Sequence, residues 1–301
     1  MIKQVRTFLR LLVDAYKELK RNDPLRLAAA TAFFTAFALP PILIILIQLF
    51  GSVFSIDNFN DRFFLQLGDS LGQESTEQVR QTYKGFKAQA RNRFITVSGV
   101  IFLMFVATTL FKIIKDSLNQ LWNIKLDTRK KLRVSMEKRL VSMVVIVLAG
   151  LLFVAGMVSE GMQALLGRYL TDLLPWAGNS LYAIISLLIS TAVVTTWFSI
   201  LFKVLPDARP QWKVVIAGGF FTGILFSIGK VIIKKLLTLG DIQSVFGPSA
   251  SIVIQLLFVF YSSFILYYGA CFTKVYGILV NMPIEPADHA VHYELVEKRN
   301  A

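Results

Sequence analysis

The sequence predicts an all-α polytopic membrane protein with about six transmembrane helices. Residues of the AVILMFWYC set make up 55% of the 301 positions, and only 17% are charged. A soluble chain of this length usually carries more charge and fewer apolar side chains. The mean hydropathy is +0.59, and the apolar residues come in long runs that a soluble core does not need. The net charge of +13 fits basic loops facing anionic lipid headgroups, so we expect no nucleic-acid partner.

The N-terminal segment, residues 1–26, is predicted to form a cationic amphipathic helix and not a signal peptide. Charges interrupt its apolar residues, and no small-residue cleavage site follows them. The apolar side chains that share one helical face are Val5, Phe8, Leu9, Leu12, Tyr16 and Leu19. With Lys and Arg on the other face, the helix suits the inner surface of a membrane, where anionic lipids would be its partners.

Six segments within residues 27–273 are apolar for about the twenty residues that a bilayer-spanning helix needs. They are Leu27–Phe54, Phe94–Ile114, Leu140–Gln163, Ser180–Phe202, Val214–Ile233 and Ala250–Thr273. Between the first two, residues 57–92 carry apolar side chains at helical spacing, which predicts an outer helical hairpin. Residues 274–301 form a polar tail, predicted to be flexible after Met282.

Basic residues in the loops predict the orientation. The N-terminal segment and the second and fourth connections between spans are rich in Lys and Arg, whereas the third has only Arg168. The positive-inside rule therefore places both termini in the cytoplasm.

The first predicted span carries Pro40 and Pro41 near its middle. Proline removes a backbone donor and clashes with the preceding turn, so we expect a kink there. Two interpretations stay open, a broken helix that borders a cavity and a kink that is simply packed.

The fourth span carries a stripe of hydroxyl groups. Thr191, Thr195 and Ser199 are spaced four residues apart and lead to Lys203. Such a stripe either lines a polar path or bonds to its own or a neighbouring helix.

The fifth span carries lysines at membrane depth. Lys230 and Lys234 continue the face of a small-residue ridge formed by Gly219, Gly223 and Ser227. Lysine at such a depth is costly unless it snorkels, pairs or lines water. Directed into a cavity, the two ammonium groups would suit an anionic substrate such as a lipid phosphate; otherwise they snorkel to the outer interface.

No cofactor, metal or enzymatic activity is predicted. Cys271 is the only cysteine, and His289 and His292, the only histidines, make a weak H-x-x-H metal signal. The acidic residues are scattered, so a two-metal nuclease site lacks obvious ligands. The Walker A, G-x-S-x-G and H-E-x-x-H motifs are all absent from the sequence.

Four local patterns, in this order, carry a family resemblance. They are the stretch AAATAFFTAFALPPILIILIQLFG from Ala28, Asn119 with Trp122, the turn with Pro206 and Asp207, and a closing run that holds Gly247, Gly269, Cys271 and Thr273. Together they resemble the YihY/BrkB family, once called ribonuclease BN. The resemblance implies a six-helix protein of the bacterial inner membrane without a settled activity. Cys271 stands where the family usually has Glu, so a proton or cation role of that carboxylate would be missing here or supplied elsewhere.

Our leading hypothesis is a transporter or lipid-handling protein with a polar cavity lined by the fourth and fifth spans. The alternative is a non-catalytic scaffold that organises envelope partners, and the least favoured is a membrane-bound ribonuclease. A homo-oligomer also stays open, because small-residue ridges serve packing within a chain as well as between chains.

Overall fold

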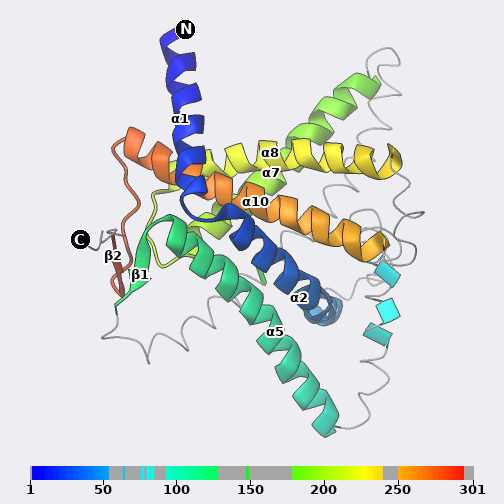
Figure 1. Ribbon diagram of the computed structural model, residues 1–301. Helices are drawn as coiled ribbons and strands as arrows, with labels where there is room; N and C mark the ends of the chain where they lie inside the picture. Colours follow the sequence, from blue (N-terminus) through cyan, green and yellow to red (C-terminus); the bar gives the residue numbers. More distant parts are fainter. Residues whose placement is uncertain are drawn as a thin grey trace.

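The computed structural model describes residues 2–53, 93–127, 178–239 and 250–294, with isolated positions at 64, 76–77, 80–81, 83–84 and 147–148. Apart from one small sheet, the elements of this part are helices, which confirms the predicted fold class (Figure 1). The elements are α1 (Ile2–Lys20), α2 (Pro24–Val53), α5 (Arg93–Leu121), β1 (Ile124–Leu126), α7 (Gly178–Val204), α8 (Trp212–Leu239), α10 (Ala250–Leu279) and β2 (Ala290–His292).

Five of the six predicted spans coincide with α2, α5, α7, α8 and α10. The other, Leu140–Gln163, lies outside the described residues except at positions 147 and 148. Within the described part, three segments are long and apolar enough to cross a membrane, namely Tyr182–Val204, Trp212–Ile232 and Val253–Leu279. The number of spans therefore stays a prediction, whereas the membrane class follows from these helices.

Helix ends are set by residues suited to them. Pro24 opens α2, where a missing backbone donor costs nothing. Asn123 and Asn281 adopt left-handed backbone conformations, with φ of 56° and 55°, directly after α5 and α10. Asparagine tolerates this conformation, and at the end of α10 the Met282 amide donates to the Gly277 carbonyl at 2.8 Å.

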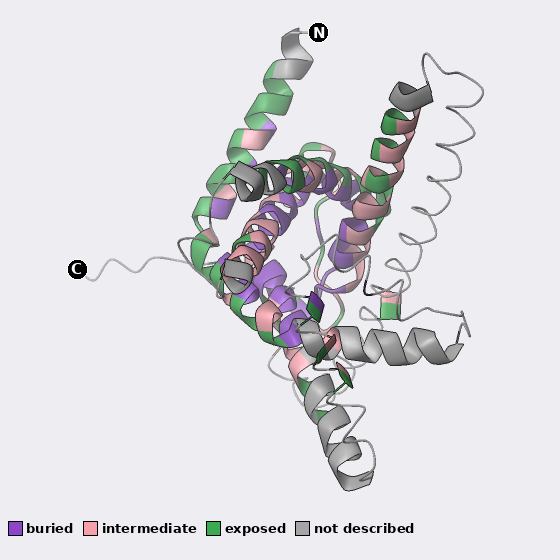
Figure 2. Ribbon diagram, turned by 90° about the vertical axis from the view of Figure 1, so that its right-hand side faces the viewer, coloured by how far each residue is buried: buried purple, intermediate pink, exposed green. Residues whose placement is uncertain are grey.

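Helix α8 packs between α7 and α10, and small residues permit both contacts. A Cβ at Gly219 would lie 2.1 Å from Ser199 Oγ of α7, and one at Gly218 would lie 1.9 Å from Thr273 Oγ1 of α10. Only glycine fits at these two crossings. Helix α10 also packs on α2, and α2 packs on α5, so the buried side chains gather in the middle of the bundle (Figure 2).

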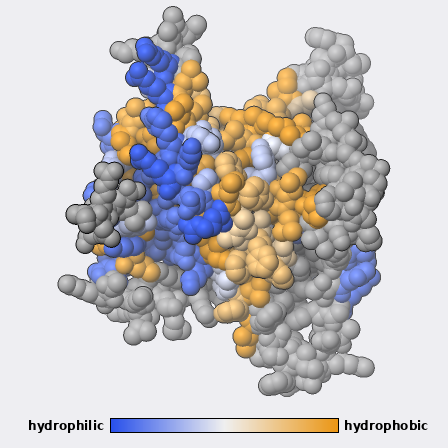
Figure 3. Space-filling view, in the orientation of Figure 1, coloured by the Kyte–Doolittle hydropathy of each residue, from blue (hydrophilic) through white to orange (hydrophobic). Residues whose placement is uncertain are grey.

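The chain after α10 turns back onto the bundle. β2 pairs antiparallel with β1, with Lys125 opposite Val291, and Ile284 and Ala290 are buried. The prediction of a flexible tail is therefore wrong for residues 283–294, because backbone hydrogen bonds and buried apolar side chains hold this segment. We call the region formed by α1, the end of α5 with β1, the α7–α8 turn and residues 280–294 the basic end. Hydrophilic side chains gather there, and hydrophobic ones cover the neighbouring helices (Figure 3).

Two further predictions concern α2 and the segment after it. α2 is one helix across Pro40 and Pro41, whose side chains lie outside the described residues, so the prolines do not divide it. Most of the predicted hairpin, residues 57–92, also lies outside them. Of its described positions, Phe64 is buried and contacts the Tyr83 ring, with 6.1 Å between centroids.

Candidate functional site

A buried carboxylate, Asp207, joins three segments at the basic end. Lys115 Nζ lies 2.7 Å from its Oδ1, and Asn119 Nδ2 donates to its Oδ2 at 2.8 Å. His289 Nε2 lies 2.8 Å from Oδ1, and the Asp207 amide donates to Asn119 Oδ1 at 2.9 Å. The carboxylate is thus bonded to side chains from α5 and from the segment after α10. Such a network satisfies a charge that would otherwise be costly to bury.

Local sequence explains how these groups meet. Lys115 and Asn119 are four residues apart on α5 and share one helical face. Asp207 follows Pro206 in the turn after α7, where proline cannot continue a helix. From the sequence, His289 was interpreted only as part of a weak metal signal, and Lys115 was not singled out. Their pairing with Asp207 was missed, because nothing in the local pattern brings these distant positions together.

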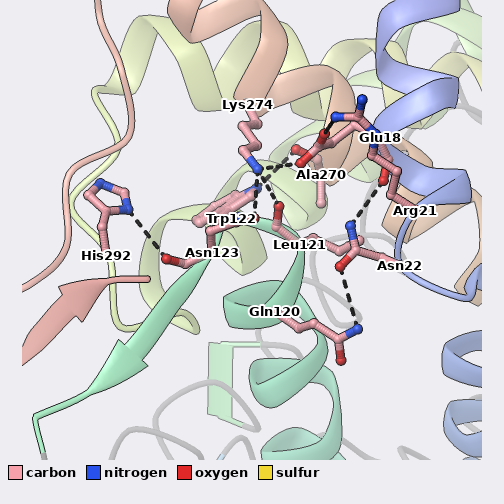
Figure 4. A network of polar contacts seen from close by, with 10 residues as sticks. All are labelled: Glu18, Arg21, Asn22, Gln120, Leu121, Trp122, Asn123, Ala270, Lys274 and His292. Atoms are coloured by element: carbon pink, nitrogen blue, oxygen red, sulfur yellow. Dashed lines mark hydrogen bonds and ion pairs between the residues drawn. The ribbon is translucent and has the colours of Figure 1, made fainter. Parts of the chain in front are cut away.

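A second polar cluster ties α1 to the ends of α5 and α10 (Figure 4). Lys274 Nζ contacts Glu18 Oε1 at 2.5 Å, and it donates to the Leu121 carbonyl and Asn123 Oδ1, both at 2.9 Å. Beside it, Trp122 Nε1 donates to the Ala270 carbonyl at 3.0 Å. Three helices therefore meet at one ammonium group.

The sheet edge next to this cluster is closed by Tyr293. Its amide donates to the Asn123 carbonyl at 3.0 Å, and Lys125 Nζ lies 5.6 Å from the ring centroid. Partial burial raises the pKa of the Tyr293 phenol above its ordinary value.

Residues of five helices line an open cavity of about 480 Å³. Its lining comes from Thr31 and Thr35 of α2, Leu110, Phe111 and Ile114 of α5, Val193, Val194, Trp197, Phe198 and Leu201 of α7, Phe226 of α8, and Ser262, Ser263 and Leu266 of α10. The hydroxyls of Thr31, Thr35 and Ser262 donate to carbonyls one turn earlier in their own helices, at 2.7–3.0 Å. The cavity therefore offers a mainly apolar surface.

The predicted hydroxyl stripe lies at the contact between α7 and α8 and not in this cavity. Thr195 and Ser199 face Gly223 and Gly219 of α8 at contact distance, and Ser199 Oγ donates to the Thr195 carbonyl at 2.8 Å. Lys203 Nζ donates to the Pro210 carbonyl at 2.6 Å. The described cavity is not lined by Thr195, Ser199 or Lys203. Half-buried Thr191 does not line it either. The predicted polar lining thus does not describe this cavity, because α7 and α8 approach too closely at the glycines to leave a path.

The structure describes the side chain of only one of the two predicted lysines. Lys230 is exposed on α8 and does not line the cavity. The side chain of Lys234 lies outside the described residues, so its role stays a prediction.

Most motif positions of the sequence analysis lie in the buried core. Trp122, Pro206, Cys271 and Thr273 are buried, and Gly269 lies against Thr222 of α8. Gly247 lies outside the described residues. These positions serve packing, whereas Asn119 and Asp207 build the polar cluster.

Comparison with known sequences decides the family. A profile described as Virulence factor BrkB matches residues 15–282, which include both polar clusters except His289 and its neighbours. The chain belongs to the BrkB family. Its BrkB-family relatives include a UPF0761 membrane protein of Pseudomonas paraeruginosa, 26% identical over 81% of this chain and 57% of the relative. Another, from Mannheimia succiniciproducens, is 24% identical over 92% of this chain and 93% of the relative.

These relatives bear on location and length. Both are named membrane proteins, in agreement with the apolar helices of this BrkB-family chain. The chain spans less than two thirds of the Pseudomonas relative. No solved structure matches the chain.

Proposed function

We propose that this BrkB-family protein handles membrane lipids by holding an acyl chain in the cavity between α2, α5, α7, α8 and α10. The observation that supports it is the character of that cavity, which has the volume of a small-molecule site and a mainly apolar lining. An acyl chain can enter such a space without losing hydrogen bonds to water.

A polar solute fits this cavity less well. Three of its hydroxyl groups already donate to their own helices, so they have no proton left for a ligand. A polar group moved from water without a replacement hydrogen bond costs roughly 2–7 kcal/mol. We therefore favour lipid handling, including lipid transport, over transport of a small polar solute, and the proposal assigns no catalytic step.

The orientation belongs to the same proposal. The basic end carries most of the described Lys and Arg residues near helix ends, which by the positive-inside rule supports a position on the cytoplasmic side of a bacterial inner membrane. Anionic lipids of that leaflet are then the first candidates for the bound molecule.

The test reconstitutes the full chain in liposomes with a lipid that carries a photoactivatable acyl chain. We expect crosslinks to cavity-lining residues of α5 and α7, and accelerated movement of labelled lipid between leaflets. Val193→Trp fills the cavity and should abolish both signals. Val231→Trp makes the same change on an exposed position of α8 and should leave both intact.

Each result has a separate meaning. Crosslinking without lipid movement would restrict the protein to lipid binding. Equal crosslinking in both tryptophan variants would overturn the cavity as the lipid site. Circular dichroism of both variants checks that the helices are retained.

A further inference from the structure

We propose that α1 is a lipid-binding surface helix, in which Arg6 and Arg10 bind the phosphates of anionic lipids. The apolar side chains of Leu9 and Val13 beside them enter the acyl layer. This inference goes beyond the cavity and does not depend on what the cavity holds.

One face of α1 is fixed to the bundle. Leu11, Ala15 and Leu19 are buried in the core that includes α10. Tyr268 of α10 donates its hydroxyl proton to the Leu12 carbonyl at 3.0 Å. Because this face is fixed, the direction of the remaining faces is also fixed.

Next to this face, α1 carries large apolar side chains that the described part of the structure covers only in part, and of these the Tyr16 ring contacts Tyr268, with 6.5 Å between centroids. Phe8, Leu9, Val13 and Tyr16 are each about half exposed. Four large apolar side chains clustered on one exposed helix are unfavourable in water and typical of a surface that meets a membrane or a partner.

Basic side chains border this apolar face. A shallow groove of about 480 Å³ is lined by Arg6, Leu9, Arg10, Val13, Asp14 and Lys17. Arg6 and Arg10 are four residues apart, so they share one helical face. Guanidinium groups present forked donors that match phosphate oxygens, and the aliphatic walls suit the adjoining glycerol and acyl region.

The orientation of α1 places these groups at the right depth. It runs crosswise to α8 and α10 and extends past them beside the end of α10 (Figure 1). The hydrophobic side of α1 is turned in the direction along which α8 and α10 run, and the hydrophilic side is turned away from them (Figure 3). A helix in the plane of a membrane surface needs this arrangement.

This arrangement favours a membrane over a nucleic acid. A nucleic-acid surface needs basic groups alone or with stacking aromatics, and it gives no reason to expose Leu9 and Val13 next to them. An anionic bilayer surface matches both features at once.

The experiment uses the full chain in nanodiscs of phosphatidylcholine, with or without phosphatidylglycerol. Hydrogen exchange of residues 2–20 reports how well α1 is protected, and native mass spectrometry counts the bound phosphatidylglycerol. We expect exchange to be slower when phosphatidylglycerol is present than in phosphatidylcholine alone. The variant R6E/R10E should bind it roughly thirtyfold more weakly, at roughly fivefold for each basic residue near the surface.

A matched variant controls for net charge. K125E/K213E makes the same charge change at two exposed lysines of the basic end outside α1 and should retain binding. Equal loss in both variants, or equal exchange of α1 in the two nanodiscs, would overturn the proposal. Binding of labelled RNA that R6E/R10E abolishes while lipid binding persists would also overturn it. Acyl-chain crosslinking in the cavity should persist in R6E/R10E, which separates this test from that of the proposed function.

Discussion

The Lys115 ammonium group lies 2.7 Å from the Asp207 carboxylate, and the two side chains are only 7% and 3% exposed. Asn119 donates to Oδ2 of the same carboxylate, and His289 Nε2 contacts its Oδ1. This pair links α5 to the turn between α7 and α8. The geometry makes Asp207 a structural centre of the basic end, since α5 and the segment after α10 both reach it.

Replacing Lys115 by Met should lower the free energy of unfolding by about 3–5 kcal/mol, because it leaves a buried carboxylate without its cation. The double variant K115M/D207N should recover part of this loss, since no charge is then stranded. Thermal unfolding of the purified protein in detergent measures both. Arg209→Met, which removes an exposed ion pair with Asp288, serves as the control and should change stability by about 0–1 kcal/mol. A loss in K115M no larger than in R209M would contradict the structural role of the pair.

The His289→Ala variant should release the segment after α10 without unfolding the bundle. It removes the contact with Asp207 at 2.8 Å, while the pairing of β1 with β2 remains. Hydrogen exchange of residues 283–294 should therefore rise while that of α10 stays unchanged. His292→Ala is the matched control. It removes a second imidazole from the same segment, but that ring is exposed and its contact with the Asn123 carbonyl is longer, at 3.4 Å. If both variants exchange alike, His289 does not hold the segment.

Gly219→Ala should destabilise the contact between α7 and α8 by about 1–3 kcal/mol, as expected for an overpacked core. The new methyl group would lie 2.8 Å from the backbone oxygen of Thr195, so shortening Ser199 cannot relieve the clash. Thermal unfolding of G219A and of G219A/S199A should therefore give similar losses. Ala183→Val adds bulk to an exposed position of α7 and should be tolerated. Full rescue by S199A would show that the side chain, and not the backbone, sets the approach.

The helices could be predicted because a membrane span is a local property of the sequence. The predicted span Ser180–Phe202 and the observed α7, Gly178–Val204, differ by two residues at each end. The prediction of a flexible tail was wrong because the structure of this segment depends on contacts that are distant in the sequence. β1 and β2 are three residues each, too short for an alternating pattern, and they exist because the chain returns to pair there.

The candidate site was predictable only in part. Sequence placed Thr195 and Ser199 on one face and Gly219 and Gly223 on another, but it could not show that these two faces meet. The two interpretations of the hydroxyl stripe, a polar path and bonds to its own or a neighbouring helix, could therefore not be separated, and the structure has a helix contact at Thr195 and Ser199. Asp207 was noticed through its motif, whereas its partners required the fold.

Lys274→Met should detach α1 from the bundle. The substitution removes the ion pair with Glu18 and two bonds to the end of α5. Hydrogen exchange of residues 2–20 should rise in detergent, where no lipid surface supports the helix. Arg21→Met, which removes an exposed partner of Glu18 at 3.7 Å, should have little effect. Unchanged exchange in K274M would mean that the apolar contacts of Leu11, Ala15 and Leu19 suffice.

Cys271 should resist maleimide while the protein is folded. Its side chain is fully buried in α10, and a thiol must reach water as thiolate to react. The measurement is labelling by mass spectrometry before and after denaturation, with Lys125→Cys at the exposed sheet edge as a reactive internal standard. We expect the new cysteine to label at once and Cys271 only after unfolding. Rapid labelling of Cys271 in the folded protein would instead show that α10 moves away from its neighbours, which would make the family's usual glutamate position reachable from water.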